Sequence, residues 1–217
     1  MSDPAFPEGL ALTPGRPLVI SDADEVLLRF LAGLERFLPS QDLYLDLKTY
    51  ALTGSIRRAG SGDAVDQPGV SQVIKTFHAT AGLDLDPVAG AAEALARISD
   101  EAQIVVLTNI IAENVTGRRA NLLAHGIDFP VINNSGLKGP MVAALARDLG
   151  APVFFVDDIP HHHASVATLA PGTHQIHFVA DERLFRMATR SPHADLFTSD
   201  WTEAADHILA TLNGRPR

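Results

Sequence analysis

Two aspartates, Asp22 and Asp24, stand just after the short apolar run Leu18-Val19-Ile20. Residues i and i+2 of an extended backbone point to the same side, so both carboxylates project together from the end of the strand that this run predicts. Open α/β sheets hold their ligands at that end of their strands. Two neighbouring carboxylates repel each other when both are ionised, so such a pair binds a cation, shares a proton or divides two roles. An acidic loop that caps the next helix explains the pair equally well when it is considered alone.

Polar residues also follow the next three apolar runs of the chain. Thr108-Asn109 ends the second run, Lys138 comes shortly after the third, and Asp157-Asp158 ends the fourth. Each of these has a simpler explanation as a helix cap or a solvated lysine. Because the ends of parallel strands lie along one edge of a sheet, we expect the side chains to converge there. Together a carboxylate, a hydroxyl, a lysine and an acidic pair make a complete site for phosphoryl transfer.

The acidic residues suit a hard cation. A phosphoryl group needs a positive charge to neutralise its oxygens, and the oxygen ligands of aspartate favour Mg²⁺. We expect the ligands to come from Asp22, from the backbone carbonyl of Asp24, and from Asp158 with or without Asp157.

The remaining roles follow from the same residue types. With its charge offset by the metal and by Lys138, the Asp22 carboxylate attacks phosphorus and forms an aspartyl-phosphate. Asp24 protonates the leaving alkoxide and then activates water. Thr108 and Asn109, together with Lys138, hold the phosphoryl oxygens.

The pattern of apolar residues predicts the elements that position these groups. Strands alternate with helical periodicity, which predicts an α/β fold with a largely parallel sheet covered by helices on both faces. Signals of helix starts are Asp86-Pro87, Gly139-Pro140, Pro160, and Asp200 with Glu203 as in a capping box. Further strands are expected at 103–109, 129–132, 152–156, 174–179 and 194–198.

Residues 29–85 have a different character and interrupt this alternation. A helix that Pro39 ends comes first, a turn-rich stretch at 59–69 follows, and a short helix is expected at 70–79. Basic and aromatic residues here are candidates for contacting a substrate, although a solvated structural role explains each of them as well. They are Lys48, Arg57, Arg58, Tyr44 and Tyr50.

The order Asp22-x-Asp24-x-Val26, Thr108, Lys138 and Asp157-Asp158 resembles the four motifs of the haloacid dehalogenase (HAD) superfamily. The resemblance covers residues 17–28 and 86–212. It implies a Rossmann-like core made of 17–28 and 86–217, a small and mainly helical cap inserted at 29–85, and an extended lead-in at 1–16.

The resemblance also implies a function. Most members of the superfamily are Mg²⁺-dependent phosphatases, and by this resemblance Asp22 is the nucleophile of a phosphate monoester hydrolase. The chain departs from the common pattern at Glu25, where glycine is usual, and at Ile159-Pro160, where small residues are usual. We interpret both departures as tuning of the site, because every reactive position is intact.

Other functions fit the same residues less fully. Dehalogenases of the superfamily displace halide from carbon and need neither a second aspartate as acid nor Mg²⁺, so Asp24 and the acidic pair favour phosphate. A phosphotransferase or mutase uses the same four residues and differs in excluding water. A non-enzymatic module that binds Mg²⁺ and a phosphorylated ligand is the alternative from a different class.

Two further features attract attention as ligands or packing groups. The adjacent residues His161, His162 and His163 point in three directions on a helix and do not all ligate one ion. His161 lies close to Asp158 in the sequence and is a candidate to approach the site, but we favour a solvated first turn. Trp201 is expected to pack.

Charge and composition restrict the partners. The formal net charge of −9 argues against nucleic acid or an anionic membrane as the main partner. The absence of cysteine excludes a thiolate nucleophile and a cysteine-ligated metal. The first residues lack the order of a signal peptide, and no apolar run is long enough for a bilayer. We therefore expect a cytoplasmic enzyme that acts on a small phosphorylated metabolite.

Overall fold

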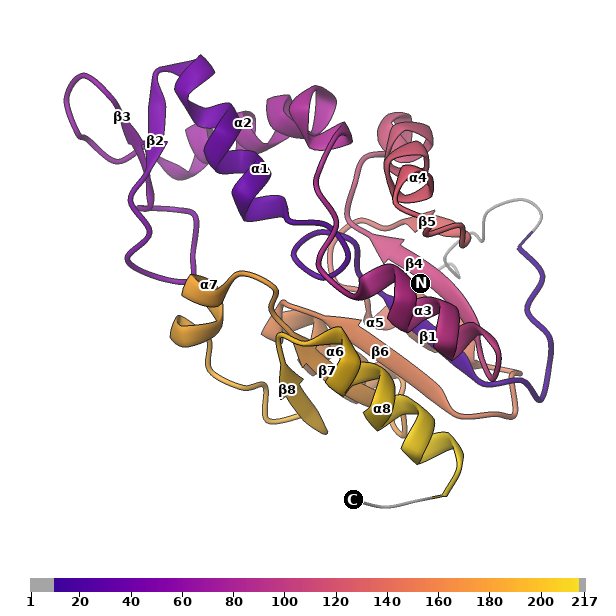
Figure 1. Cartoon of the computed structure of the whole chain (residues 1–217). Helices are drawn as coiled ribbons and strands as arrows, with labels where there is room; N and C mark the ends of the chain where they lie inside the picture. Colours follow the sequence, from indigo (N-terminus) through magenta and orange to yellow (C-terminus); the bar gives the residue numbers. More distant parts are fainter. Residues whose placement is uncertain (1–9, 215–217) are drawn as a thin grey trace.

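A computed structural model describes residues 10–214 of the chain. Its centre is a six-stranded sheet in the order β5-β4-β1-β6-β7-β8, and all neighbouring strands run parallel (Figure 1). The strands are β1 (Leu18–Ser21), β4 (Gln103–Thr108), β5 (Val131–Asn133), β6 (Val153–Asp157), β7 (His174–Phe178) and β8 (Leu196–Thr198).

Strand β1 lies in the middle of the sheet, and this position explains why Leu18, Val19 and Ile20 are all apolar. Successive residues face opposite sides: Val19 joins one hydrophobic cluster, whereas Leu18 and Ile20 join another. All three side chains are fully buried. A strand that is covered on both faces needs apolar residues at every position rather than at alternate ones.

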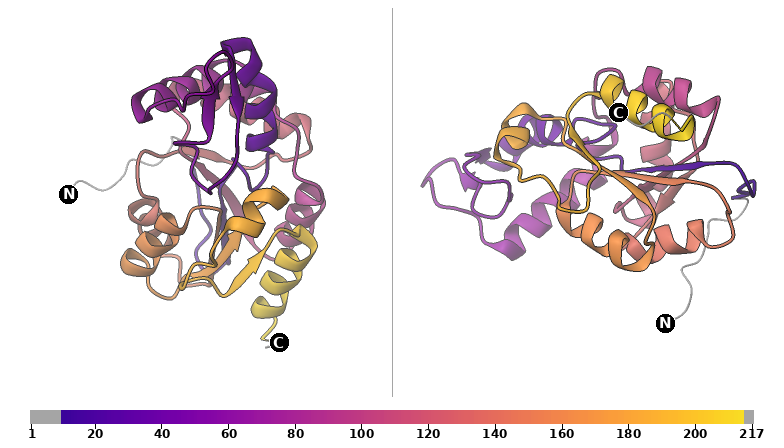
Figure 2. Two further views of the ribbon diagram at one scale, coloured as in Figure 1. Left: turned by 90° about the vertical axis from the view of Figure 1, so that its left-hand side faces the viewer. Right: turned by 90° about the horizontal axis from the view of Figure 1, so that it is seen from below.

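Helices cover both faces of the sheet (Figure 2). Helices α3 (Ala91–Ser99) and α8 (Trp201–Leu212) supply buried residues to the cluster that contains Val19. Helices α5 (Gly139–Ala146) and α6 (Pro160–Leu169) pack on the opposite face, and α4 (Val115–Ala124) lies near the β4–β5 edge. The predicted α/β architecture with a doubly covered parallel sheet is confirmed.

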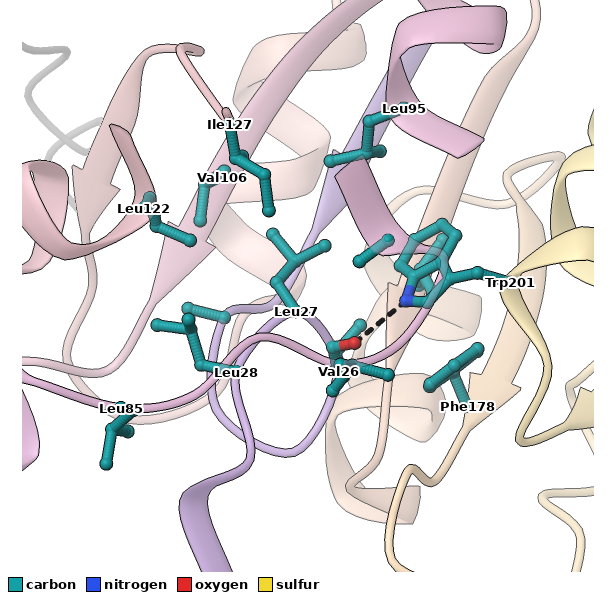
Figure 3. Packing of buried hydrophobic residues seen from close by; sticks show 14 of the residues in the cluster. Val26, Leu27, Leu28, Leu85, Leu95, Val106, Leu122, Ile127, Phe178 and Trp201 are labelled. Carbon is teal, nitrogen blue, oxygen red and sulfur yellow. Dashed lines mark hydrogen bonds between the residues drawn. The ribbon is translucent and has the colours of Figure 1, made fainter. Parts of the chain in front are cut away.

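Trp201 anchors α8 against the loop that follows β1. Its indole Nε1 donates a hydrogen bond of 2.8 Å to the carbonyl oxygen of Val26, and its ring is fully buried (Figure 3). The packing role predicted for Trp201 is therefore confirmed. Asp200 caps the helix as predicted, since its side chain accepts from the backbone N–H of Thr202. Glu203 does not complete the capping box, because its carboxylate accepts from the Thr198 hydroxyl instead.

Residues 29–85 lie beyond the carboxyl ends of the strands (Figure 1). This segment contains α1 (Phe30–Phe37) and α2 (Gln67–Ala79), two 3₁₀ turns, η1 (Leu38–Gln41) and η2 (Ala81–Leu83), and a short antiparallel hairpin. The hairpin strands, β2 (Leu43–Leu45) and β3 (Ile56–Arg58), were not predicted. Phe37, Leu43, Ile56 and Phe77 belong to the same hydrophobic cluster as the sheet, so the segment shares the core.

The helix start predicted at Asp86-Pro87 is wrong. The backbone there runs beside the loop after β1: the Arg29 N–H donates to the Asp86 carbonyl, and the Val88 N–H donates to the Leu27 carbonyl. These bonds hold residues 86–88 extended. Helix α3 therefore begins only at Ala91, after Gly90 in a left-handed conformation with φ of 77°.

Smaller differences occur elsewhere. A helix of six residues, α7 (Glu182–Met187), was not predicted, although Asp181 caps it. A 3₁₀ turn, η3 (Ala112–Asn114), precedes α4. The lead-in expected at 1–16 falls partly outside the described residues, and Leu10 and Leu12 pack against the cluster of Leu18 and Ile20. Within 10–214, no helix has the length and apolar character needed to cross a bilayer.

Candidate active site

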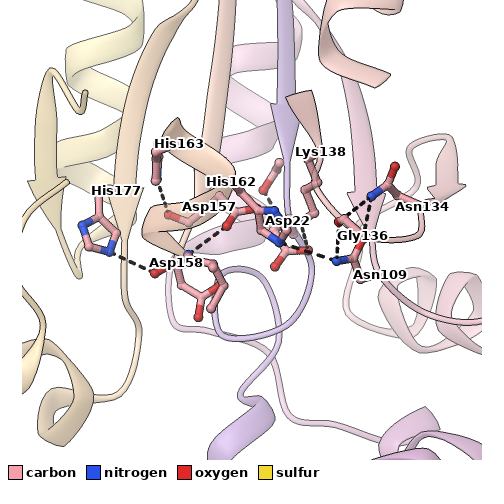
Figure 4. A network of polar contacts seen from close by, with 12 residues as sticks. Asp22, Asn109, Asn134, Gly136, Lys138, Asp157, Asp158, His162, His163 and His177 are labelled. Carbon is pink, nitrogen blue, oxygen red and sulfur yellow. Dashed lines mark hydrogen bonds and ion pairs between the residues drawn. The ribbon is translucent and has the colours of Figure 1, made fainter. Parts of the chain in front are cut away.

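Lys138 joins two of the predicted aspartates at the carboxyl edge of the sheet. Its Nζ lies 2.6 Å from Oδ1 of Asp22, which follows β1, and 2.7 Å from Oδ2 of Asp157, which ends β6 (Figure 4). All three side chains are buried. The convergence predicted for these strand ends is therefore present.

Burial and this ion pair set the pKa values of the group. Burial acts to lower the pKa of Lys138, but the two carboxylates outweigh it and the pKa lies above its usual value, so the amine stays charged. Burial raises the pKa of Asp22 to about 7, against the opposing effect of Lys138. One lysine therefore does not compensate the carboxylates around it.

The uncompensated charge fits a divalent cation. Asp22, Asp157 and Asp158 each offer a carboxylate oxygen, and these atoms lie within 4.8 Å of one another. Burial, and then the charges of Asp157 and Asp22, raise the pKa of Asp158 well above its usual range. A cluster of buried carboxylate oxygens is the donor set that Mg²⁺ and Ca²⁺ favour.

The two members of the acidic pair differ in availability. Asp157 is already engaged at both oxygens, with Lys138 Nζ on Oδ2 and the Ile159 N–H on Oδ1 at 2.8 Å. Asp158 lines a cavity and receives a contact from Tyr50, whose hydroxyl lies 3.3 Å from its Oδ2. Asp158 is thus the member that is free to meet a ligand.

Two buried histidines hold the loop that carries this pair. His163 Nε2 lies 2.9 Å from the carbonyl oxygen of Asp157, and His177 Nε2 lies 2.9 Å from that of Asp158 (Figure 4). Since the Ser191 N–H donates to His177 Nδ1, His177 donates through Nε2. Burial, assisted by His163, lowers the pKa of His177 to about 4 and keeps the ring neutral.

The solvated first turn is confirmed for His161, but it does not extend to the next two histidines. His161 is exposed, whereas His162 and His163 are buried. His162, not His161, lines the cavity. The first turn of α6 packs against β6 and the loop after it, so only one of three successive side chains can face solvent.

Asp24 forms an ion pair with one residue that the sequence did not indicate, Arg118, and lies near a second, His78. Its Oδ1 lies 2.7 Å from Nη2 of Arg118, a fully buried residue of α4, and its Oδ2 lies 4.0 Å from Nε2 of His78 on α2. Burial lowers the pKa of His78 although Asp24 opposes the shift, so the ring is neutral at pH 7. A cation on the buried face of a predicted helix is the signal that points to Arg118.

Thr108 and Asn109 occupy the end of β4. The Thr108 side chain is fully buried, and within the described structure its hydroxyl has no hydrogen-bond partner. Asn109 lines the cavity, donating to the Gly136 carbonyl at 3.1 Å and accepting from Asn134 at 2.8 Å (Figure 4). A buried hydroxyl without a partner costs free energy, which a ligand oxygen would recover.

Glu25 stands where the resemblance leads us to expect glycine, and it adopts a glycine-like backbone. Its φ is 62°, in the left-handed region that L side chains rarely occupy. The side chain is buried, and its Oε2 accepts from the Leu31 N–H at 2.8 Å, at the start of α1. Burial raises its pKa to about 7 even though this hydrogen bond opposes the shift.

Of the candidates in residues 29–85, only Tyr50 reaches a predicted site residue through a described contact. Its hydroxyl donates to the carbonyl oxygen of Asp158 at 2.8 Å. Lys48 and Arg57 instead each lie 2.8 Å from the same oxygen of Asp46, and neither residue lines the cavity. Tyr44 is exposed.

These groups surround a cavity of about 190 Å³. Most of the lining residues come from 17–28 and 86–217, and residues 29–85 contribute Phe30 and His78. The lining residues are Asp22, Asp24, Glu25, Phe30, His78, Asn109, Lys138, Asp158, Ile159 and His162.

Comparison with known proteins identifies the fold. No family model and no curated protein matches the chain. Among solved structures, a HAD family hydrolase from Deinococcus radiodurans R1 with bound phosphate and sodium is 19% identical with a TM-score of 0.61, and covers 93% of this chain and 98% of its own. The HAD-hydrolase YfnB from Bacillus subtilis, bound to magnesium, is 16% identical with a TM-score of 0.58, covering 91% and 99%.

An L-2-haloacid dehalogenase is also similar, at 13% identity and a TM-score of 0.56, with 89% of this chain and 100% of that one covered. The similar structures thus span nearly the whole chain and include proteins of different named activities. The chain has the fold of the haloacid dehalogenase-like hydrolases.

Proposed function

We propose that the protein is a Mg²⁺-dependent phosphatase of the HAD superfamily that hydrolyses a phosphate monoester through an aspartyl-phosphate on Asp22. One observation carries the proposal: Lys138 lies between Asp22 and Asp157, while Asp24 stands two residues beyond Asp22 at the same cavity. This is a nucleophile, its neutralising cation and an acid–base group in one place.

In the first half of the reaction, an Asp22 carboxylate oxygen forms a bond to phosphorus and the bond to the ester oxygen breaks. Lys138 offsets the charge of the nucleophile and of the phosphoryl oxygens. Asp24, entering as the acid, gives its proton to the leaving alkoxide. Thr108 and Asn109 at the end of β4 supply hydrogen bonds to the transferring oxygens.

In the second half, water attacks the phosphorus of the aspartyl-phosphate and the bond to Asp22 breaks. Asp24, now ionised, accepts the proton of the attacking water. Inorganic phosphate leaves, and both aspartates return to their starting states. The small cavity keeps the reacting groups close and oriented, which reduces the entropic cost of each step.

A metal ion fits the residues present. When bound, Mg²⁺ supplies charge neutralisation at the phosphoryl oxygens. Asp22, Asp158 and the backbone carbonyl of Asp24 would hold it, whereas Asp157 would act by positioning Lys138. We further propose residues 29–85 as the cap, a small phosphorylated metabolite as the substrate, and the cytoplasm as the location.

Rival activities have less support from the site. Haloacid dehalogenase chemistry has no use for a second aspartate beside the nucleophile or for a cluster of three buried carboxylates. A phosphotransferase would use the same residues, but no particular observation favours it. A binding module would need no acid–base group at Asp24.

The test is release of phosphate from a panel of phosphate monoesters, with Mg²⁺ or with EDTA. We expect turnover that needs Mg²⁺ and that disappears in Asp22→Asn. Asp128→Asn serves as a matched control, because this exposed aspartate lies on the surface beside Arg119. Full turnover by Asp22→Asn would refute the proposal, and stabilisation by Mg²⁺ without any turnover would favour the binding module.

A further inference from the structure

We infer that the leaving group of the substrate is small and carries no negative charge: it is a neutral or cationic alcohol. The inference rests on the proposed phosphatase function and names the class of ester on which that site acts. It follows from the charges and the size of the cavity.

The wall of the cavity is acidic. Four carboxylates line it, from Asp22, Asp24, Glu25 and Asp158, and among the described residues Lys138 is the one lysine or arginine that does so. Lys138 is already shared between Asp22 and Asp157. In the proposed reaction the charge of Lys138, together with that of the metal, neutralises the phosphoryl oxygens. No other lysine or arginine among the described lining residues is then left to compensate a second anionic group on the substrate.

Three further cations, Arg118, Lys48 and Arg57, are also engaged. Arg118 lies behind Asp24, fully buried, with Nη2 2.7 Å from that carboxylate. Lys48 and Arg57 contact Asp46 in the hairpin region and do not line the cavity. Among the described residues, an anionic leaving group would therefore find no unengaged lysine or arginine in the cavity wall to compensate its charge.

The groups that face the leaving group from the cap are rings. Phe30 and His78 both line the cavity, with ring centroids 5.6 Å apart. Their faces suit an apolar carbon chain, and a ring face also attracts an ammonium group. A carboxylate or a second phosphate finds no donor of positive charge on them.

The volume limits the leaving group further. Pockets for small molecules usually have volumes of about 300–1,000 Å³, whereas this cavity has about 190 Å³. Since the phosphoryl group occupies part of this space, the protein surrounds only a few further non-hydrogen atoms of the leaving group. Two- and three-carbon esters match this size.

A matched series of two-carbon esters tests the charge. Ethanolamine phosphate, ethylene glycol phosphate and phosphoglycolate have leaving groups of similar size that are cationic, neutral and anionic at pH 7. We expect kcat/KM for the first two to exceed that for phosphoglycolate by about tenfold or more, the factor that a free-energy difference of roughly 1.4 kcal/mol produces. A hexose 6-phosphate should be slower than ethylene glycol phosphate by a similar factor.

Variants at the cap connect the preference to these residues. His78→Arg adds a cation opposite Asp24 and should raise kcat/KM for phosphoglycolate relative to ethylene glycol phosphate. His78→Gln removes the ring without adding charge and should leave the order of the esters unchanged. Gln72→Arg is the matched control, because this exposed residue of the same helix adds the same charge away from the cavity. Melting temperatures show that each variant is folded.

The outcomes separate this inference from the proposed function. If Asp22-dependent hydrolysis is found but phosphoglycolate is the best of the three esters, the inference is overturned and the phosphatase function stands. Equal or faster hydrolysis of the hexose phosphate overturns the limit on size. If no ester is hydrolysed, calorimetric affinities of the same esters in the presence of Mg²⁺ decide: the same order supports the inference, and preference for phosphoglycolate overturns it.

Discussion

Nη2 of Arg118 lies 2.7 Å from Oδ1 of Asp24, and this contact fixes the carboxylate that the proposed reaction uses for proton transfer. Arg118 is fully buried on α4, whereas the Asp24 side chain keeps about a fifth of its surface exposed (21%) toward the cavity. The carboxylate is therefore bound on its inner side and free on its outer side. A buried guanidinium also depends on its partner, because an unpaired buried charge is costly.

We expect Asp24→Asn to lower kcat by about a hundredfold or more, the usual loss when a general acid–base group is removed. We also expect it to lower the free energy of unfolding by about 3 kcal/mol, since Arg118 loses its countercharge. The double variant Asp24→Asn/Arg118→Met should recover part of the stability but none of the turnover. Phosphate release and urea unfolding measure the two effects.

The exposed pair Arg119–Asp128 provides the control for this cycle. Its atoms lie 3.8 Å apart and both side chains are about two-thirds exposed (64%). Replacing either residue should change the free energy of unfolding by less than about 1 kcal/mol. If Asp24→Asn is no more destabilising than Asp128→Asn, the buried pair does not stabilise the site as argued.

Metal binding should be linked to protons. Burial raises the pKa of Asp22 to about 7, so this group carries a proton in the metal-free protein below that pH, and burial also raises the pKa of Asp158 well above its usual range. Mg²⁺ must displace these protons, and its affinity should therefore rise with pH up to and through 7, by up to about tenfold per unit for each proton released. Calorimetry in buffers of different ionisation enthalpy counts the protons.

Asp22→Asn removes one of the titrating groups and should reduce the number of protons released on Mg²⁺ binding. An affinity that is the same at pH 6 and pH 8 would contradict the linkage. Asp128→Asn should release as many protons as the wild type.

The site residues at strand ends could be predicted from the sequence, whereas those on helices could not. Asp22, Thr108, Asp157 and Asp158 each come directly at the end of an apolar run, and parallel pairing brings such ends to one edge. Their meeting could therefore be predicted without knowing any angle between elements. The place of Lys138 could be predicted in the same way, because this residue lies between strand β5 and helix α5, at the N-cap position of the helix.

Arg118 and His78 could not be predicted in this way. Both lie on helices, where the direction of a side chain depends on how the helix rotates and where it packs. Arg118 reaches Asp24 only because α4 places it inward, and His78 does so only because α2 lies over the strand ends. The helix signal at Asp86-Pro87 failed for a related reason: backbone bonds to Leu27 and Arg29 hold that stretch extended.

Glu25 makes stability depend on pH with a definite sign. Its pKa is about 7 in the folded protein against 4.5 for the ordinary group, so between these values the folded state binds more protons than the unfolded state. Its contribution is therefore complete below pH 4.5 and is lost as the pH rises through 7. Glu25→Gln stays neutral and can still accept from the Leu31 N–H.

We expect the free energy of unfolding of Glu25→Gln, relative to the wild type, to increase by about 3 kcal/mol between pH 4.5 and pH 8, because the pKa of Glu25 is about 7 in the folded protein against 4.5 for the ordinary group. Urea unfolding without metal measures it. Glu182→Gln is the control, since that side chain is largely exposed in α7, and it should show a constant difference. A constant difference for Glu25→Gln would refute the linkage.

Tyr50 should act on the metal rather than on the substrate. Its hydroxyl donates to the carbonyl oxygen of Asp158, which also accepts from His177, so Tyr50→Phe loosens the loop without freeing it. We expect a loss of about 1 kcal/mol in unfolding free energy and a fall of about tenfold in Mg²⁺ affinity, as is usual when a group that orients a ligand is removed. At saturating Mg²⁺, kcat should be close to that of the wild type. Tyr44→Phe, at an exposed tyrosine of β2, should change neither. If Tyr50→Phe instead lowers kcat at saturating Mg²⁺ and leaves the Mg²⁺ affinity unchanged, Tyr50 acts on the substrate, because the loss then appears in turnover and not in metal binding.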